Sequence, residues 1–206
     1  MRRCANFWAI MTCVLAGPAL AETASCKDAV AAAFTKQRTS RAFSMDAQIK
    51  AENGPVRITV EYIPPDRMRQ TIIAPGQTPL ETVLVGTRAW SQQGGRWEEL
   101  APAIAQTIIA QVRDAVVEPP KDVGEFECLD KATIDGKEYL AYRSIEKKPD
   151  ATVHRKVYVD PQTGLPAINI VAEDKPGGEV LFNGVYAYPT DLVIDGHPEA
   201  PLAKIR

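Results

Sequence analysis

Hydrophobic and polar residues alternate along most of this chain, and a helical period replaces the alternation in two places. The first, residues 27–37, is rich in alanine and puts four side chains on one side at helical spacing: Val30, Ala33, Phe34 and Gln37. The second, residues 102–117, carries apolar residues in steps of four: Ile104, Ile108, Val112 and Val116. Pro102 suits a first helical turn, and Pro119-Pro120 prevents continuation. The pattern predicts two amphipathic helices.

The alternating segments predict β-strands. Residues 43–49 and 56–62 form a hairpin around Asn53-Gly54, because this dipeptide favours a tight turn. Each strand of the hairpin has one apolar face: Phe43, Met45, Ala47 and Ile49 in the first, and Val56, Ile58, Val60 and Tyr62 in the second. Residues 62–97 continue as three short strands with turns at proline and glycine. Further strands are expected at residues 125–131, 139–147, 153–160, 167–174 and 179–188.

These elements predict a mainly β fold with helical insertions (α+β). The expected sheet has about ten to eleven strands, and an antiparallel sheet of this size usually curls instead of leaving flat edges exposed. We therefore predict an open antiparallel half-barrel covered by two or three helices. The tail, residues 189–206, holds few apolar residues and is expected to lie on the surface or to be mobile.

The N-terminus has the pattern of a secretory signal peptide. A basic start at Arg2-Arg3 precedes an uncharged apolar run, and Ala19-Leu20-Ala21 supplies small residues for cleavage. We expect residues 1–21 to be removed and residues 22–206 to form a single domain in the periplasm. The apolar run is too short to span a bilayer comfortably, so no transmembrane anchor is expected.

Two cysteines remain after residue 21, Cys26 and Cys128. In an oxidising compartment they predict one disulfide that closes a loop of about a hundred residues. Two alternatives stay open: a pair of buried free thiols, and a lipid anchor on Cys26, although Thr23 is a poor residue for the lipidation signal. No CxxC spacing occurs, so we expect no metal site.

Charge and motif content argue against two classes of function. The whole chain carries a net charge of −2, and loss of Arg2 and Arg3 brings the mature chain to −4, which is unlike the basic footprint of a nucleic-acid-binding protein. The two histidines, His154 and His197, have no nucleophile motif beside them, and His154 is expected to be exposed on its strand. We therefore predict no catalytic residues and no cofactor.

The apolar strand faces exceed what one small helix can cover. The residues expected near a ligand cavity are Ile58, Val60, Tyr62, Met68, Ile72, Leu84, Trp90 and Trp97. The residues expected to form a lid over it are Ile104, Ile108 and Val112. The alternative is that these side chains simply make a packed core.

Two motifs carry a resemblance to a known family. Pro65-Asp66-Arg67-Met68-Arg69 is followed by Trp90 and Trp97, and Asp160-Pro161-Gln162-Thr163-Gly164-Leu165-Pro166 joins two later strands. In this order, over residues 27–194, the chain resembles the LolA/LolB and LppX-type superfamily of periplasmic outer-membrane lipoprotein carriers. One position departs from the sorting carrier itself, which has an arginine directly before the proline, where Ile63 and Pro64 stand here.

The resemblance implies an open β-barrel with helical lids that holds acyl chains or lipidated proteins in an apolar cavity. The function expected is therefore a periplasmic carrier or binding protein for a lipid, acyl chain or lipoprotein. The alternative is a non-catalytic envelope regulatory or sensor domain of the same fold, whose partner is a protein.

Overall fold

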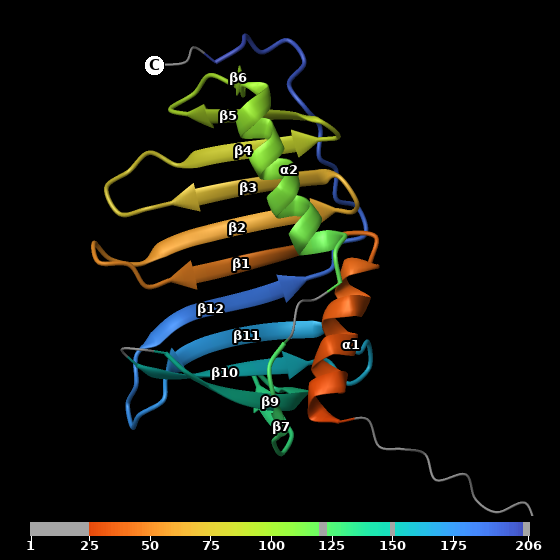
Figure 1. Cartoon of the computed structure of the whole chain (residues 1–206), viewed down its shortest axis with the longest axis vertical. Coiled ribbons are helices and arrows are strands. Elements are labelled where there is room, and N and C mark those ends of the chain that lie inside the picture. The colour runs from red at the N-terminus through yellow and green to blue at the C-terminus, as the bar shows by residue number, and fades with distance from the viewer. Residues whose placement is uncertain (1–24, 120–122, 149–150, 204–206) are drawn as a thin grey trace, which may run out of the picture.

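The fold is a single large antiparallel sheet with two helices on one face (Figure 1). The computed structural model describes residues 25–119, 123–148 and 151–203. The helices are α1 (Cys26–Arg38) and α2 (Pro102–Val116). The strands are β1 (Phe43–Ile49), β2 (Val56–Ile63), β3 (Arg67–Ile73), β4 (Leu80–Val85), β5 (Arg88–Gln93), β6 (Glu98–Glu99), β7 (Glu127–Cys128), β8 (Ala132–Ile134), β9 (Lys137–Lys147), β10 (Thr152–Val159), β11 (Pro166–Glu173) and β12 (Val180–Ala187).

The predicted fold class is confirmed: the sheet is open, mainly antiparallel β with helical insertions, and has twelve strands instead of ten or eleven. The strand order is β6-β5-β4-β3-β2-β1-β12-β11-β10-β9-β7, with β8 paired to β9. The first and last strands therefore meet at the centre, where Met45 lies opposite Tyr186 and Ala47 opposite Gly184. On one side of this seam the strands β1 to β6 follow one another in chain order, and on the other side β12 to β9 do so in reverse, as Figure 1 shows.

Both helices begin as their sequences predict. The side chain of Ser25 caps α1 by accepting a hydrogen bond from the backbone N–H of Asp28 at 3.1 Å, which satisfies one of the free N–H groups of the first turn. Pro102 occupies the first turn of α2, where its missing N–H costs nothing. Val30, Ala33 and Gln37 are the buried residues of α1, in agreement with the predicted face.

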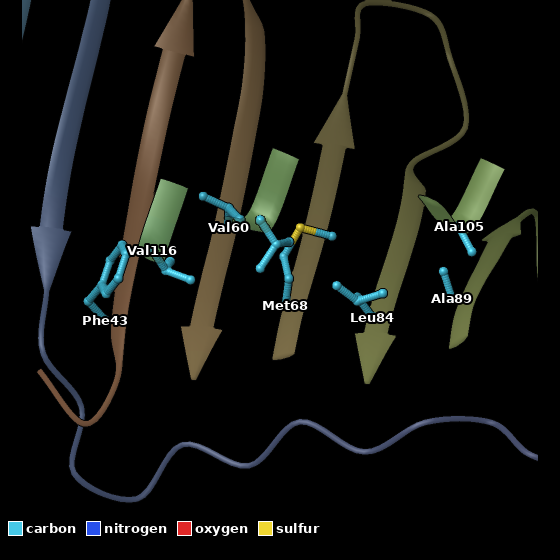
Figure 2. Close-up of a cluster of buried hydrophobic side chains, with 8 residues drawn as sticks. Phe43, Val60, Met68, Leu84, Ala89, Ala105 and Val116 are labelled. Carbon is cyan, nitrogen blue, oxygen red and sulfur yellow. The ribbon is translucent and has the colours of Figure 1, made fainter. Parts of the chain in front are cut away.

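Helix α2 packs across strands β1 to β5 and buries the main hydrophobic cluster (Figure 2). The antiparallel register explains this cluster, because Tyr62, Met68, Leu84 and Ala89 lie opposite one another on successive strands and so share a face. The α2 residues that meet them are Ala105, Val112 and Val116. Helix α1 makes a second cluster, in which Val30 and Ala33 pack on Tyr142, Val157 and Val159.

A disulfide fixes the start of α1 to the far edge of the sheet. Cys26 and Cys128 are bonded, with Cα atoms 5.4 Å apart and a sequence separation of 102. Cys128 belongs to β7, the last strand on that side. The predicted disulfide is confirmed.

The tail lies on the surface, as one of the two expectations has it, and it is anchored there: among residues 189–203 only Ile194 is fully buried. Residues 189–203 cross the outer face of the sheet, opposite the helices, and Ile194 is completely buried there against Val83 and Trp90. Arg67 donates a hydrogen bond to the carbonyl of Ile194 at 2.9 Å, and the backbone of Glu99 pairs with the tail near Leu202. A few apolar residues suffice because Ile194, with Leu192 and Ala200 beside it, packs on an already apolar strand face.

Candidate functional site

The two helices lie over different parts of the sheet and leave a chamber between them. Helix α1 contacts β7, β10 and β11, whereas α2 contacts β4 and β5. The central strands β1, β2 and β12 form the floor between the helices, and a cavity of about 300 Å³ lies there. Its lining residues come from six elements and the segment after α2: Phe34, Gln37, Arg38, Phe43, Met45, Tyr62, Ala115, Val123, Arg155 and Tyr186.

A second hollow of about 550 Å³ continues from the chamber along the same face of the sheet. The two spaces share Val123 and Arg155, so Arg155 lies at their junction. The second hollow includes polar groups, among them Ser144 and Asn169, together with apolar Val171 and Phe182. The face below the helices is therefore hollow on both sides of Arg155.

Four aromatic rings line the chamber. The rings of Phe43 and Tyr62 lie 5.0 Å apart between centroids, and those of Phe34 and Tyr186 meet edge to face at 6.3 Å. The register brings three of them together, because Phe43 is opposite Tyr62 and Met45 is opposite Tyr186. Burial raises the pKa of Tyr62 to about 12, so its hydroxyl is neutral at physiological pH. The aromatic part of the wall is therefore uncharged.

Two arginines bring positive charge to this wall. The guanidinium of Arg155 lies 5.3 Å from the ring centroid of Phe34, and its Nε donates a hydrogen bond to Asn169 Oδ1 at 2.9 Å. The Nη1 atom of Arg38 is buried without a hydrogen-bond partner among the described residues. Burial lowers the pKa of both groups, but an arginine keeps its charge in a protein.

The end of α1 is tied to the sheet by a short chain of hydrogen bonds. Gln37 Nε2 donates to the hydroxyl of Tyr188 at 3.3 Å, and that hydroxyl donates to the carbonyl of Pro166 at 2.7 Å. Since Gln37 is one turn from Phe34 and next to Arg38, this link fixes the helix face that borders the chamber.

Of the residues predicted near a cavity, Tyr62 lines the chamber. Val60, Met68 and Leu84 are only 2%, 4% and 1% exposed and pack beneath α2. Ile58 and Ile72 lie opposite each other on the same face, half-buried, and are not part of that packed cluster.

Trp90 and Trp97 lie elsewhere. Ala89 faces α2, so alternation turns Trp90 to the outer face, where it packs with Ile194. Trp97 stacks on His197 of the tail with ring centroids 3.9 Å apart. The structure therefore does not bring the two tryptophans to the chamber.

The predicted lid residues also separate. Val112 is buried against the sheet and Ile108 packs at the edge of the same cluster. Ile104 is 53% exposed, because Ala105 takes the inward position in that turn. Beside the chamber, α2 contributes Ala115.

The sequence interpretation did not select Arg38 or Arg155. A signal for Arg155 was present, since it stands between the buried residues Val153 and Val157 at an inward position of an alternating strand. An arginine at such a position is uncommon unless it has a partner or a function. No comparable pattern marks Arg38, which follows the last inward residue of α1.

His154 is not exposed as expected. Its side chain is half-buried on the outer face, with Nδ1 3.3 Å from Asp174 Oδ1, and Arg143 donates to the same oxygen at 2.6 Å. The ring lies beside Asp174, a contact that alternation along one strand does not predict. Among the described residues there is no group of three or more His, Cys, Asp or Glu side chains suited to a metal ion, and neither helix is long and apolar enough to cross a membrane. The signal-peptide prediction falls on residues outside those described.

No protein-family model matches the sequence, and no curated protein matches it. Among solved structures, the chain is similar to MucB in the MucA/MucB complex of Pseudomonas aeruginosa, with a TM-score of 0.47 and 11% identity over 87% of this chain. It spans 64% of that MucB chain. A MucB structure by itself gives a TM-score of 0.44 at 11% identity, covering 86% of this chain and 64% of that one.

A domain from Vibrio parahaemolyticus, described as an outer membrane lipoprotein-sorting protein, is also similar, with a TM-score of 0.30 and 11% identity. The match covers 80% of this chain and 93% of that domain. These likenesses concern the fold alone.

Proposed function

We propose that the protein is an exported carrier or binding protein that holds the apolar part of a lipid, acyl chain or lipoprotein in the chamber between α1, α2 and the sheet. The observation that supports this most directly is the cavity of about 300 Å³ walled by Phe34, Phe43, Tyr62 and Tyr186. Its size is at the lower end of the range of small-molecule sites, roughly 300–1,000 Å³.

The physical reason is the hydrophobic effect. An acyl chain that enters the chamber leaves water and covers aromatic and methionine surface, at about 25 cal/mol per Å² of apolar area removed from water. The hollow of about 550 Å³ shares Val123 and Arg155 with the chamber, and we propose that a longer ligand extends into it. The proposal includes no chemical step, and it places the mature chain in the periplasm on the basis of the signal-like residues 1–21.

A second candidate is the binding of an envelope protein partner. It is favoured by a broad hollow of about 880 Å³ on the outer face of the sheet. Ile73 and Val185 are 43% and 49% exposed there, beside the Asp46–Arg57 ion pair. Exposed apolar groups rimmed by charges are typical of protein interaction sites.

Titration with the neutral apolar dye 1-N-phenylnaphthylamine separates the two candidates, because the dye becomes fluorescent in apolar surroundings. The carrier proposal predicts saturable fluorescence with one dye per protein. Substitution of Ile73 by Ser on the outer face should leave this binding unchanged. Absence of saturable binding, or its loss in Ile73→Ser with the fold intact, would count against the chamber as the site.

A further inference from the structure

The arginines of this protein fall into two groups according to the face of the sheet on which they lie. On the outer face every arginine of the described strands has a specific partner: Arg57 with Asp46, Arg67 with the Ile194 carbonyl, Arg69 with Glu61, Arg88 with Glu99, and Arg143 with Asp174. The two arginines that line the chamber, Arg38 and Arg155, have no carboxylate within ion-pair distance among the described residues.

Acidic residues are near but do not pair with these two. The charge of Asp114 on α2 acts on Arg38, and that of Glu146 on β9 acts on Arg155, in both cases favouring the charged guanidinium. In both cases the influence is that of a nearby charge and not of a side-chain hydrogen bond. The full sequence has 26 acidic and 24 basic residues, and within the described ranges the two chamber arginines still form no ion pair with a carboxylate.

Holding these charges in the chamber is costly. A half-buried cation loses part of its hydration, and a buried guanidinium N–H without an acceptor, as at Arg38 Nη1, adds a further cost. Asn169 accepts from Nε of Arg155, and no other hydrogen bond from Arg155 is found within the described ranges, which leaves both Nη groups for a ligand in the chamber. A guanidinium fork matches the geometry of a carboxylate or a phosphate better than any other polar partner.

We propose that the chamber selects amphiphiles with an anionic headgroup, a carboxylate or a phosphate, which Arg38 and Arg155 bind while the aromatic wall takes the apolar chain. This inference rests on the proposed function and specifies its ligand class. The placement is suited to it, because the Arg155 guanidinium lies directly over the ring of Phe34, where head and chain of one molecule would meet.

A matched ligand series tests the proposal with the wild-type chain. Dodecanoate, dodecyl phosphate, dodecanol and dodecyltrimethylammonium share one alkyl chain and differ only in the head. Each competes with 1-N-phenylnaphthylamine at physiological salt. We expect at least one of the two anions to bind about tenfold or more tightly than dodecanol, the scale of a charge-assisted hydrogen bond, and the order of the two anions tells a carboxylate site from a phosphate site.

Substitutions assign the effect to the two side chains. Arg38→Gln and Arg155→Gln should each weaken binding of the preferred anion far more than binding of dodecanol, so that most of the preference for the anion is lost. Arg41→Gln, an exposed arginine just beyond α1, removes the same charge and should keep the preference. Equal binding of dodecanoate, dodecyl phosphate and dodecanol to the wild type overturns this inference while the carrier proposal stands. No binding of the dye or of any dodecyl compound overturns the carrier proposal itself.

Discussion

The Cα atom of Gly196 lies against the indole ring of Trp90, so close that a Cβ atom at this position would stand 2.6 Å from Cη2 and 2.7 Å from Cζ3 of the ring. Trp90 comes from the outer face of β5 and Gly196 from the C-terminal tail, more than a hundred residues later. The glycine lets the tail pass flat across the ring. This contact, next to the buried Ile194, explains how a segment with few apolar residues becomes part of the core.

Gly196→Ala should therefore destabilise the protein. Overpacking of this kind costs about 1–3 kcal/mol, which corresponds to a fall in melting temperature of about 2–10 °C in a domain of this size. Asp195→Ala, at the exposed neighbouring position, is the control and should melt within a degree or two of the wild type. An unchanged melting temperature for Gly196→Ala would mean that the tail does not hold this contact in solution.

The disulfide between Cys26 and Cys128 should stabilise the fold by restricting the unfolded chain. For a loop of 102 residues the expected contribution is about 4 to 5 kcal/mol, and its loss should lower the melting temperature by roughly 10 °C. Thermal melts of the oxidised protein and of a Cys26→Ala/Cys128→Ala double variant measure the difference. Two titratable thiols in the denatured, unreduced wild type, or acyl chains on Cys26 in its mass spectrum, would contradict the bond.

Asp160 should make stability depend on acid pH. A hydrogen bond from Lys137, followed by backbone N–H groups of Gln162 and Thr163, lowers the pKa of its carboxyl group. Because the folded-state pKa is below the unfolded one, near 3.9, the stabilisation is present above the unfolded pKa and is lost as pH falls through the folded pKa.

The corresponding variant is Asp160→Asn, which keeps the shape and removes the charge. Its melting temperature should be lower than that of the wild type at neutral pH. The difference between the two melting temperatures should shrink once the pH falls below the ordinary pKa range of aspartate. A difference of the same size at neutral pH and in acid would show that charge at residue 160 is not the cause.

Helix α2 is proposed as the lid of the chamber. Helix α2 contacts the sheet through one of its own faces. Strands β2 and β4, in contrast, are hydrogen-bonded to a neighbouring strand on each side. Hydrogen exchange should find the amides of α2 opening more readily than those of β2 and β4, and dodecanoate should slow exchange in α2. Equal protection of the helix and these strands, unchanged by dodecanoate, would remove the lid from the account.

The local elements of this fold could be predicted because their signals are local. The hairpin of β1 and β2, the turns at proline and glycine, and both helices follow from periodicity and turn chemistry over fewer than twenty residues. The pairing of β1 with β12 could not be predicted, because it joins segments about 140 residues apart that have no distinguishing pattern.

The site was only partly predictable for a related reason. Alternation predicts which residues of a strand share a face, and it placed Phe43 and Met45 on the apolar face of one strand of the hairpin and Tyr62 on that of the other. It does not predict which face of the sheet the helices cover. Trp90 shows this limit, since its neighbour Ala89 faces α2 and Trp90 faces the tail. Arg155 was not predicted because the sequence interpretation placed only apolar residues near the cavity.

The most direct test of the account is to fill the chamber without disturbing the core. Ala115 lines the chamber from α2, and Ala110 lies exposed on the same helix. Binding of 1-N-phenylnaphthylamine and dodecanoate to Ala115→Trp should weaken by about tenfold or more, because the indole occupies space that the ligand needs, while Ala110→Trp should bind as the wild type does. Wild-type affinity in an Ala115→Trp protein that retains the native circular dichroism would contradict the claim that the ligand lies between the helices and the sheet.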